Sequence, residues 1–284
     1  MSGGPDSMAL LLLAQQVLDG RFAVATVDHQ LRPESRNEAD YVREICRNVG
    51  VPHILLTPDE AISGNIQSSA RSARYALLER AADEQHCTHI ATAHHADDQL
   101  ETLLMRVARG SGVDGLSAIR TTNGRVIRPL LDFSKAELVD ICAQSGIKPV
   151  EDPSNANDDY DRVSIRQWLA STDHPFRTDR ATRTARALAE ASDALFWMAD
   201  MLAAQRIRHE NGMVICDARD IPDELKRRLL LRSLAIIDSD LAPRGETIDR
   251  ILADLARGGT ATIGNIKCLG GEYWQFLRAP ARRS

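Results

Sequence analysis

Two hydrophobic periodicities alternate along the first half of the chain. Short apolar runs typical of buried strands are RFAVATVDH, VPHILL and THIATAHH, and a further short strand is expected near Arg125–Ile127. Segments with helical spacing separate them: a helix that starts near Pro5, ESRNEADYVREICRNVG, NIQSSARSARYALLERAADEQH, DDQLETLLMRVARG and a helix from Ser134 to Ser145. This alternation predicts a parallel sheet with helices on both faces, and ligands of such sheets bind beyond the C-terminal ends of the strands.

The pattern changes near Arg177. The segment TDRATRTARALAEASDALFWMADMLAAQRIRHE is strongly helical, and further helical stretches follow around residues 224–237 and 247–257. The end of the chain alternates around Gly270-Gly271, which predicts a hairpin. We therefore expect a parallel-sheet α/β domain over residues 1–176 and a smaller, mainly helical domain over residues 177–284.

The charge is distributed unevenly between the two halves. The whole chain has a net charge of −5, but residues 160–284 hold 20 Lys/Arg and 17 Asp/Glu, so the charge excess of this part is positive. Arg177, Arg180, Arg183 and Arg186 recur every three residues within it. One interpretation is ordinary fluctuation and a solvated helix face, and the other is a basic accessory half with a ridge of phosphate contacts.

Membrane insertion and secretion are not favoured by the sequence. No apolar run approaches the ~20 residues that span a bilayer. The run MALLLLAQQVL follows the acidic Asp6, without the basic segment and the cleavage site of a signal peptide. The five cysteines are scattered and odd in number, which predicts neither a disulfide framework nor a zinc site and fits a reducing cytoplasm.

The first residues, SGGPDS, have the chemistry of an anion-binding loop. Gly3 and Gly4 permit close backbone approach, and Pro5 suits the first position of a helix, whose free N–H groups attract anions. The hydroxyls of Ser2 and Ser7 add donors. Asp6 would repel a bare phosphate, so we expect it to act through Mg²⁺. The alternative is a plain turn and helix cap, since the Gly-Lys-Ser/Thr ending of the common phosphate loop is absent.

SGGPDS resembles the SGGxDS signature of the PP-loop ATP pyrophosphatases, which have a Rossmann-like parallel sheet. Five further segments follow in order: VDHQLRPESRNEADYVREICRNVGVP, NIQSSARSARYALL, ATAHHADDQLETLLMRVARGSGVDGL, RPLLDFSKAEL and VEDPSNANDDYDRVSIR. Together they closely resemble the tRNA(Ile)-lysidine synthetase family over nearly the whole first 170 residues. One departure is RVSIR, where members often have Arg-Asn-Arg-Ile-Arg, so the resemblance assigns no firm role to Arg162 and Arg166.

The resemblance implies a two-step ligase. ATP adenylates the wobble cytidine of a tRNA-Ile with a CAU anticodon at ring carbon 2, and L-lysine then displaces AMP. The implied ATP-binding residues are Ser2, Gly3, Gly4, Pro5, Asp6, Ser7, Asp28 and His29, with Asp6 as the Mg²⁺ ligand. The implied catalytic residues are Asp6, Arg74, His94, Asp98 and Glu101. A homodimer is left open.

The acidic segment DDQLE has three interpretations. Asp98 and Glu101 share one helix face and can hold the ammonium of lysine or take a proton from it. In isolation, the same residues would suit a solvated helix start. The third interpretation is a metal site formed by His94, His95, Asp97 and Asp98.

Two rival functions compete with this interpretation. A tRNA thiolase of the same superfamily needs sulfur-handling cysteines, usually a CxxC pair, which this sequence lacks. A tRNA-binding protein that has lost catalysis is the other rival, because family members have a hydrophobic strand before SGG and Met1 stands where that strand should end. We expect the missing strand to be encoded in frame upstream of Met1, and favour an active enzyme.

Overall fold

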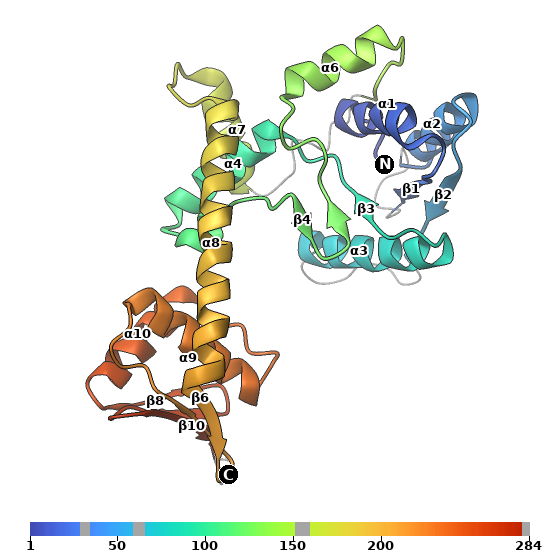
Figure 1. Ribbon diagram of the computed structural model, residues 1–284. Helices are drawn as coiled ribbons and strands as arrows, with labels where there is room; N and C mark the ends of the chain where they lie inside the picture. Colours follow the sequence, from blue (N-terminus) through green and yellow to red (C-terminus); the bar gives the residue numbers. More distant parts are fainter. Residues whose placement is uncertain (29–34, 59–65, 151–159, 280–284) are drawn as a thin grey trace. The chain divides into compact units, whose positions relative to one another are not determined.

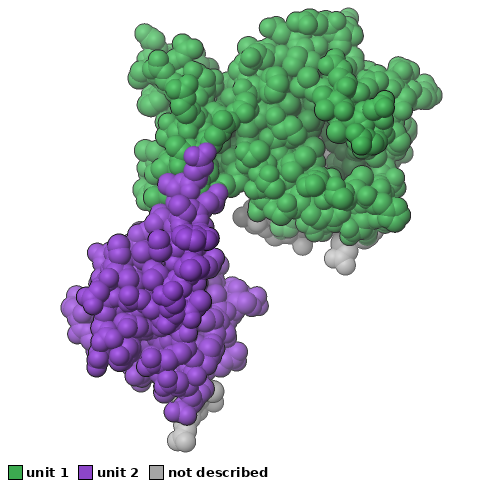
Figure 2. Space-filling view, viewed as in Figure 1, with its two compact units in different colours: residues 1–189 green, residues 190–284 purple. Residues whose placement is uncertain are grey.

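The computed structural model describes residues 1–28, 35–58, 66–150 and 160–279 of the 284-residue chain. These residues form two compact units, residues 1–189 and 190–284 (Figure 2). The division falls inside one long helix, α8 (Thr178–Arg206), whereas the sequence pattern placed the domain boundary at residue 176. The four arginines that recur from Arg177 to Arg186 therefore belong to the first unit.

The first unit contains two pairs of parallel strands. β1 (Val24–Val27) pairs with β2 (His53–Leu56), and β3 (Ile90–Ala91) pairs with β5 (Val126–Ile127). A short strand, β4 (Thr122–Asn123), adds antiparallel to β5. The α/β architecture with parallel strands and crossover helices is confirmed, although the strand expected in THIATAHH is limited to two residues.

Helices cover both faces of β1 and β2 (Figure 1). On one face lie α1 (Pro5–Leu18), α2 (Ser35–Asn48) and α6 (Lys135–Gln144), and on the other lies α3 (Ile66–Glu84). This unit also contains α4 (Ala96–Ala108), α5 (Val113–Leu116), α7 (Tyr160–Ser171) and the first turns of α8. Strands buried on both faces favour apolar residues at successive positions, and β1 (VATV) is apolar except for Thr26, whose buried hydroxyl hydrogen-bonds with His53 Nε2 at 2.9 Å.

Local sequence signals fix the start of two helices that matter for the site. α1 begins at Pro5, as the sequence predicted, with Gly4 as its N-cap. α6 follows Ser134, whose side chain accepts a hydrogen bond from the backbone N–H of Glu137 while Glu137 bonds back to Ser134. This capping box sets where Lys135 projects, because it makes Lys135 the first residue of α6.

The second unit is built on a five-stranded antiparallel sheet in the order β6-β7-β10-β9-β8. Its strands are β6 (Ile207–Glu210), β7 (Met213–Cys216), β8 (Thr260–Ile263), β9 (Ile266–Leu269) and β10 (Trp274–Arg278). Two helices, α9 (Asp223–Ile237) and α10 (Gly245–Ala256), pack on the sheet and share its apolar core. The sequence pattern predicted both helices and the hairpin around Gly270-Gly271, and the structure adds the other strands of the sheet.

Candidate active site

The SGGPDS loop forms a compact turn at the N-terminus of α1. Gly3 has φ +86°, and a Cβ placed there would lie 3.1 Å from a methyl group of Val150, so a larger residue would be strained. The backbone N–H of Val150 donates to the carbonyl of Gly3 at 2.9 Å. Ser7 Oγ donates to the carbonyl of Gly4 at 3.0 Å. The loop is thus held by bonds that leave the first N–H groups of α1 available to an anion.

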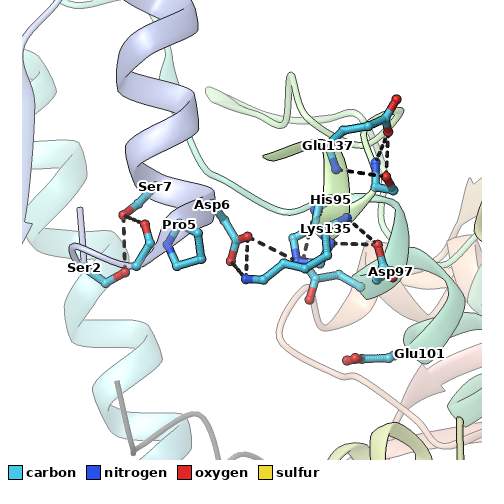
Figure 3. A network of polar contacts seen from close by, with 12 residues as sticks. Ser2, Pro5, Asp6, Ser7, His95, Asp97, Glu101, Lys135 and Glu137 are labelled. Carbon is cyan, nitrogen blue, oxygen red and sulfur yellow. Dashed lines mark hydrogen bonds and ion pairs between the residues drawn. The ribbon is translucent and has the colours of Figure 1, made fainter. Parts of the chain in front are cut away.

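Asp6 is held by a lysine that the sequence analysis did not single out. Lys135 Nζ lies 2.7 and 2.8 Å from the two carboxylate oxygens of Asp6, although the two residues are 129 positions apart (Figure 3). The lysine side chain is 40% exposed. SGGPDS lacks the lysine of the common phosphate loop, and α6 brings one to the same place. The signal was present in the segment RPLLDFSKAEL, where a Ser-x-x-Glu capping box precedes an apolar helix.

The N-terminus of α4 joins this pair from another direction. His95 is the N-cap of α4, and its backbone N–H donates to Asp98 Oδ2 at 3.0 Å. The backbone N–H of Lys135 donates to Asp97 Oδ2 at 2.7 Å, and His95 Nε2 lies 3.7 Å from Asp6 Oδ1. The two most specific segments of the sequence, SGGPDS and AHHADDQLET, therefore meet in one polar network (Figure 3).

The two adjacent histidines have opposite electrostatic surroundings. Burial lowers the pKa of His94 to about 4, and the nearby Asp98 only partly opposes this, so His94 is neutral at pH 7. Burial also acts to lower the pKa of His95, but the carboxylates of Asp97, Asp98 and Asp6 outweigh it and raise the pKa. The pKa of Asp97 is lowered, since its contacts with His95 and Lys135 outweigh burial. The network therefore favours the charged form of His95 beside the ionised form of Asp97.

Glu101 occupies a different environment from Asp98, although both lie on α4. Glu101 is 5% exposed and forms a two-pronged ion pair with Arg166 of α7, in which Nε–Oε1 is 2.8 Å and Nη2–Oε2 is 3.0 Å. Arg162 Nη2 donates to Thr102 Oγ1 at 3.1 Å beside it. The two arginines that the departure RVSIR left without a role thus contact the acidic helix of the candidate site.

A pocket of about 430 Å³ lies beside this ion pair. It is formed by α4, α7 and the first residues of α8, and its lining consists of Asp97, Leu100, Glu101, Arg166, Leu169, Ala170, His174, Phe176, Arg177, Thr178 and Asp179. Asp97 belongs both to the pocket wall and to the network around Asp6. A ligand in the pocket would therefore lie next to the polar network of Asp6, Lys135 and His95.

Two other predicted residues, Asp28 and Arg74, lie elsewhere in the first unit. Asp28 follows the last residue of β1 and is 5% exposed, and its Oδ1 accepts a hydrogen bond from Ser35 Oγ at 2.7 Å. His29 lies outside the described residues. Arg74 is exposed on α3. The pKa of the Met1 amino group is lowered mainly by burial of that group and further by the charge of Arg74, whereas the charge of Arg71 helps to lower the pKa of His94. The role predicted for Arg74 stays a prediction.

The described residues support neither a metal site of His, Cys, Asp and Glu side chains nor a membrane-spanning helix. Among the described residues, no group of three or more His, Cys, Asp or Glu side chains is arranged to hold a metal ion. Three of the four residues of the metal interpretation, His95, Asp97 and Asp98, contact one another in the network, whereas His94 Nδ1 lies 3.0 Å from Thr92 Oγ1. Within the described ranges, no helix combines the length and the apolar character required to cross a bilayer.

Comparison with known proteins identifies relatives over the full length. Residues 1–172 match the family model described as a PP-loop domain. A tRNA(Ile)-lysidine synthase from Zymomonas mobilis subsp. mobilis is 42% identical over 292 residues, covering 100% of this chain and 88% of that protein. A tRNA(Ile)-lysidine synthase from Novosphingobium aromaticivorans is 41% identical and covers 100% of this chain and 89% of that protein.

Among solved structures, the U34-tRNA thiolase NcsA from Methanococcus maripaludis with its [4Fe-4S] cluster has a similar fold. The TM-score is 0.56 at 18% sequence identity, and the match covers 67% of this chain and 70% of that chain. At this identity the likeness supports the fold of the PP-loop unit alone.

Proposed function

We infer the reaction of this chain from its family, because the chain belongs to the tRNA(Ile)-lysidine synthases, PP-loop proteins that match it over its whole length. It is a ligase that forms a carbon–nitrogen bond between lysine and the wobble cytidine of tRNA-Ile. The observation that supports this most directly is the contact between Asp6 of SGGPDS and Lys135, whose backbone in turn binds Asp97 of AHHADDQLET. The fold brings residues of two distant motifs to one place, which supports a shared role in one reaction.

The first step is adenylation of the cytidine, for which the loop would hold ATP. The free N–H groups at the start of α1 and the buried Gly3 and Gly4 suit the pyrophosphate part of ATP. Mg²⁺ is commonly bound by one or two carboxylates together with phosphate oxygens, and Asp6 is the carboxylate at this loop. When bound, Mg²⁺ would offset the charge that develops on the leaving pyrophosphate. Lys135 can turn from Asp6 to a phosphate, because its side chain is partly exposed.

The second step is attack by lysine. A lysine amine forms a bond to ring carbon 2, AMP leaves with the oxygen, and the amine loses a proton. Asp98 is the carboxylate best placed to hold the lysine ammonium, because its side chain is 18% exposed whereas that of Glu101 is 7% exposed. Glu101 is already bound to Arg166, so we assign it the positioning of that guanidinium at the pocket wall. Arg166 would then meet the carboxylate of lysine.

A thiolase activity is disfavoured by the cysteines themselves. All five are free, and four of them are buried. Burial raises the pKa of Cys216 and of Cys268 to about 11, and it also raises the pKa of Cys46 and Cys142. Sulfur transfer requires accessible thiolates, which burial suppresses. Free cysteines also fit our proposal that the enzyme works in the reducing cytoplasm.

The proposed function is tested by incubating the protein with ATP, Mg²⁺, labelled L-lysine and an unmodified tRNA-Ile with a CAU anticodon. We expect label in the tRNA together with AMP and pyrophosphate. ADP and phosphate as products would contradict the PP-loop chemistry. Binding of the tRNA without any AMP would instead support the rival in which catalysis has been lost. A tRNA with a different wobble base serves as the control.

We propose that exposed arginines at the start of α8 bind tRNA phosphates. Arg180 and Arg183 are exposed, and within the described ranges neither has an acidic partner within 4 Å, whereas Arg177 pairs with Asp179 and Arg186 with Asp132. Glutamate at both positions should weaken tRNA binding. It should also reduce the slope of log K against log salt by about 0.7–0.9 for each phosphate that the variant no longer binds.

The control for this prediction makes the same charge change elsewhere on the first unit. Arg36 and Arg43 of α2 are exposed, with side-chain exposures of 60% and 48%. The double variant Arg36→Glu/Arg43→Glu should retain a steeper salt dependence than Arg180→Glu/Arg183→Glu. Equal slopes for the two variants would mean that Arg180 and Arg183 affect tRNA binding only through the net charge of the protein.

A further inference from the structure

Three aromatic rings gather where α7 passes into α8. Trp168 and His174 stack with their centroids 5.9 Å apart and an interplanar angle of 24°. Phe176 lies 6.0 Å from each of them, centroid to centroid. His174 Nε2 is 3.1 Å from the carbonyl oxygen of Leu169, which fixes the middle ring. We call these three residues the aromatic platform.

The aromatic platform is exposed rather than packed into the core. Trp168 is 43% exposed and Phe176 is 42% exposed, in a chain with only 4% aromatic residues. An aromatic ring gains most of its stabilising energy from burial, so a cluster left half in water has surface available for a ligand. His174 and Phe176 also line the 430 Å³ pocket, so the platform continues into a concave site.

The charges around the platform select the kind of ligand. The pocket wall carries Asp97, whose negative charge disfavours a phosphate beside it, and two ion pairs, Glu101–Arg166 and Asp179–Arg177. Arg177 lines the pocket and pairs with Asp179 at the surface at 3.3 Å, where solvent weakens the pair. Arg180 is exposed one turn further along α8. A nucleotide satisfies this pattern when its flat, uncharged base lies on the platform at the pocket rim and its phosphates lie toward these arginines.

We propose that the aromatic platform stacks an unpaired base of the tRNA anticodon loop. The proposal rests on the proposed function, because a reaction at the wobble cytidine requires that base to leave its stack in the loop. When the wobble cytidine leaves the stack, its neighbouring base in the loop loses a stacking partner, and the rings of the aromatic platform replace that partner. Asp97 connects the two sites, since it lines the pocket and accepts from the backbone of Lys135, which holds Asp6. The lysine substrate takes the inner wall at Arg166, and the base takes the rim.

The test uses the whole chain and an anticodon stem-loop RNA whose loop contains CAU. Phe176→Leu and Trp168→Leu keep apolar bulk but remove the ring faces, whereas Phe176→Tyr and Trp168→Phe keep a ring. We expect each leucine variant to weaken binding of the stem-loop by roughly 5- to 150-fold, the range given by loss of one stacked base. The ring-retaining variants should stay close to the unmodified protein. Binding of a fully paired duplex of the same stem should not change.

A second measurement does not depend on the leucine variants being folded. A series of stem-loops, each with one abasic nucleotide in the loop, is titrated into the unmodified protein while tryptophan fluorescence is followed. One loop position should be required for quenching, and the Trp168→Phe protein should lose that quenching signal. Quenching that no abasic position removes, or equal weakening of duplex and stem-loop by the leucine variants, would overturn the platform. The proposed function fails separately, if the unmodified protein joins no lysine to tRNA.

Discussion

Asp6→Ala is expected to abolish AMP formation while leaving the fold intact. The change removes the carboxylate proposed to hold Mg²⁺ and the partner of Lys135 at the N-terminus of α1. Loss of one preorganised electrostatic contact at the reacting charge commonly reduces kcat by about 10²–10³-fold, and we expect at least that. The Asp6–Lys135 pair is partly exposed, with side-chain exposures of 27% and 40%, so its contribution to stability is at most about 1 kcal/mol. Release of pyrophosphate from ATP in the presence of tRNA is the measurement.

Variants of Lys135 separate the role of the cation from that of its carboxylate partner. Lys135→Met should also slow pyrophosphate release strongly, and Lys135→Arg should recover part of the rate because a positive charge returns. Asp40→Ala on the surface of α2 serves as the matched control and should leave the rate unchanged. Normal pyrophosphate release by the Asp6→Ala protein would exclude Asp6 from the chemistry.

Lys135 also shows where sequence reasoning about a site stops. The loop, its helix and the acidic start of α4 could be predicted, because glycine, proline and capping residues act over a few positions. The contact of Lys135 with Asp6 joins residues 129 positions apart. The capping box of Ser134 and Glu137 predicts that Lys135 is the first residue of a helix, but it does not say which carboxylate the lysine contacts. The fold brings the two together by packing α6 against α1, which only the tertiary structure shows.

The sheet of the second unit was underestimated for a different reason. β6 and β7 form a hairpin in which Glu210 pairs with Met213, leaving Asn211 and Gly212 at the turn with φ values of 51° and 75°. Asn-Gly is a strong signal for this kind of turn. The strand before it, IRHE, is mostly exposed and lacks apolar alternation, so its pattern alone predicts the end of the preceding helix. Here the turn residues were more informative than the hydrophobic pattern.

The ion pair between Glu101 and Arg166 changes the role that the sequence suggested for Glu101. Spacing alone placed Asp98 and Glu101 together on one helix face as two carboxylates for the lysine ammonium. In the folded protein Asp98 contacts His95, whereas both oxygens of Glu101 are bound by Arg166. A carboxylate already neutralised by a guanidinium is a poor partner for an ammonium. Glu101 is therefore better described as a positioning residue, and its role stays a prediction.

Glu101→Gln is expected to destabilise the protein and to weaken lysine binding. Breaking a fully buried ion pair costs about 3–5 kcal/mol, and we expect about 1–3 kcal/mol because Arg166 is 40% exposed. Loss of an oriented charged hydrogen bond should raise the KM for lysine by roughly 10- to 100-fold, with little change in the KM for ATP. Urea unfolding and steady-state kinetics measure the two effects.

The double variant Glu101→Gln/Arg166→Gln separates positioning from stability. Two amides can hydrogen-bond to each other, and only Arg162, whose Nε lies 3.7 Å from Glu101 Oε2, keeps its charge there, so the double variant should regain part of the stability that Glu101→Gln loses. Its KM for lysine should remain high, because the guanidinium that meets the lysine carboxylate is gone. If the KM instead returned toward normal together with stability, the ion pair would serve the fold alone. Lysine would then have to be held by Asp98 and its neighbours at the start of α4, and Asp98→Asn would become the variant with the largest effect on the KM for lysine.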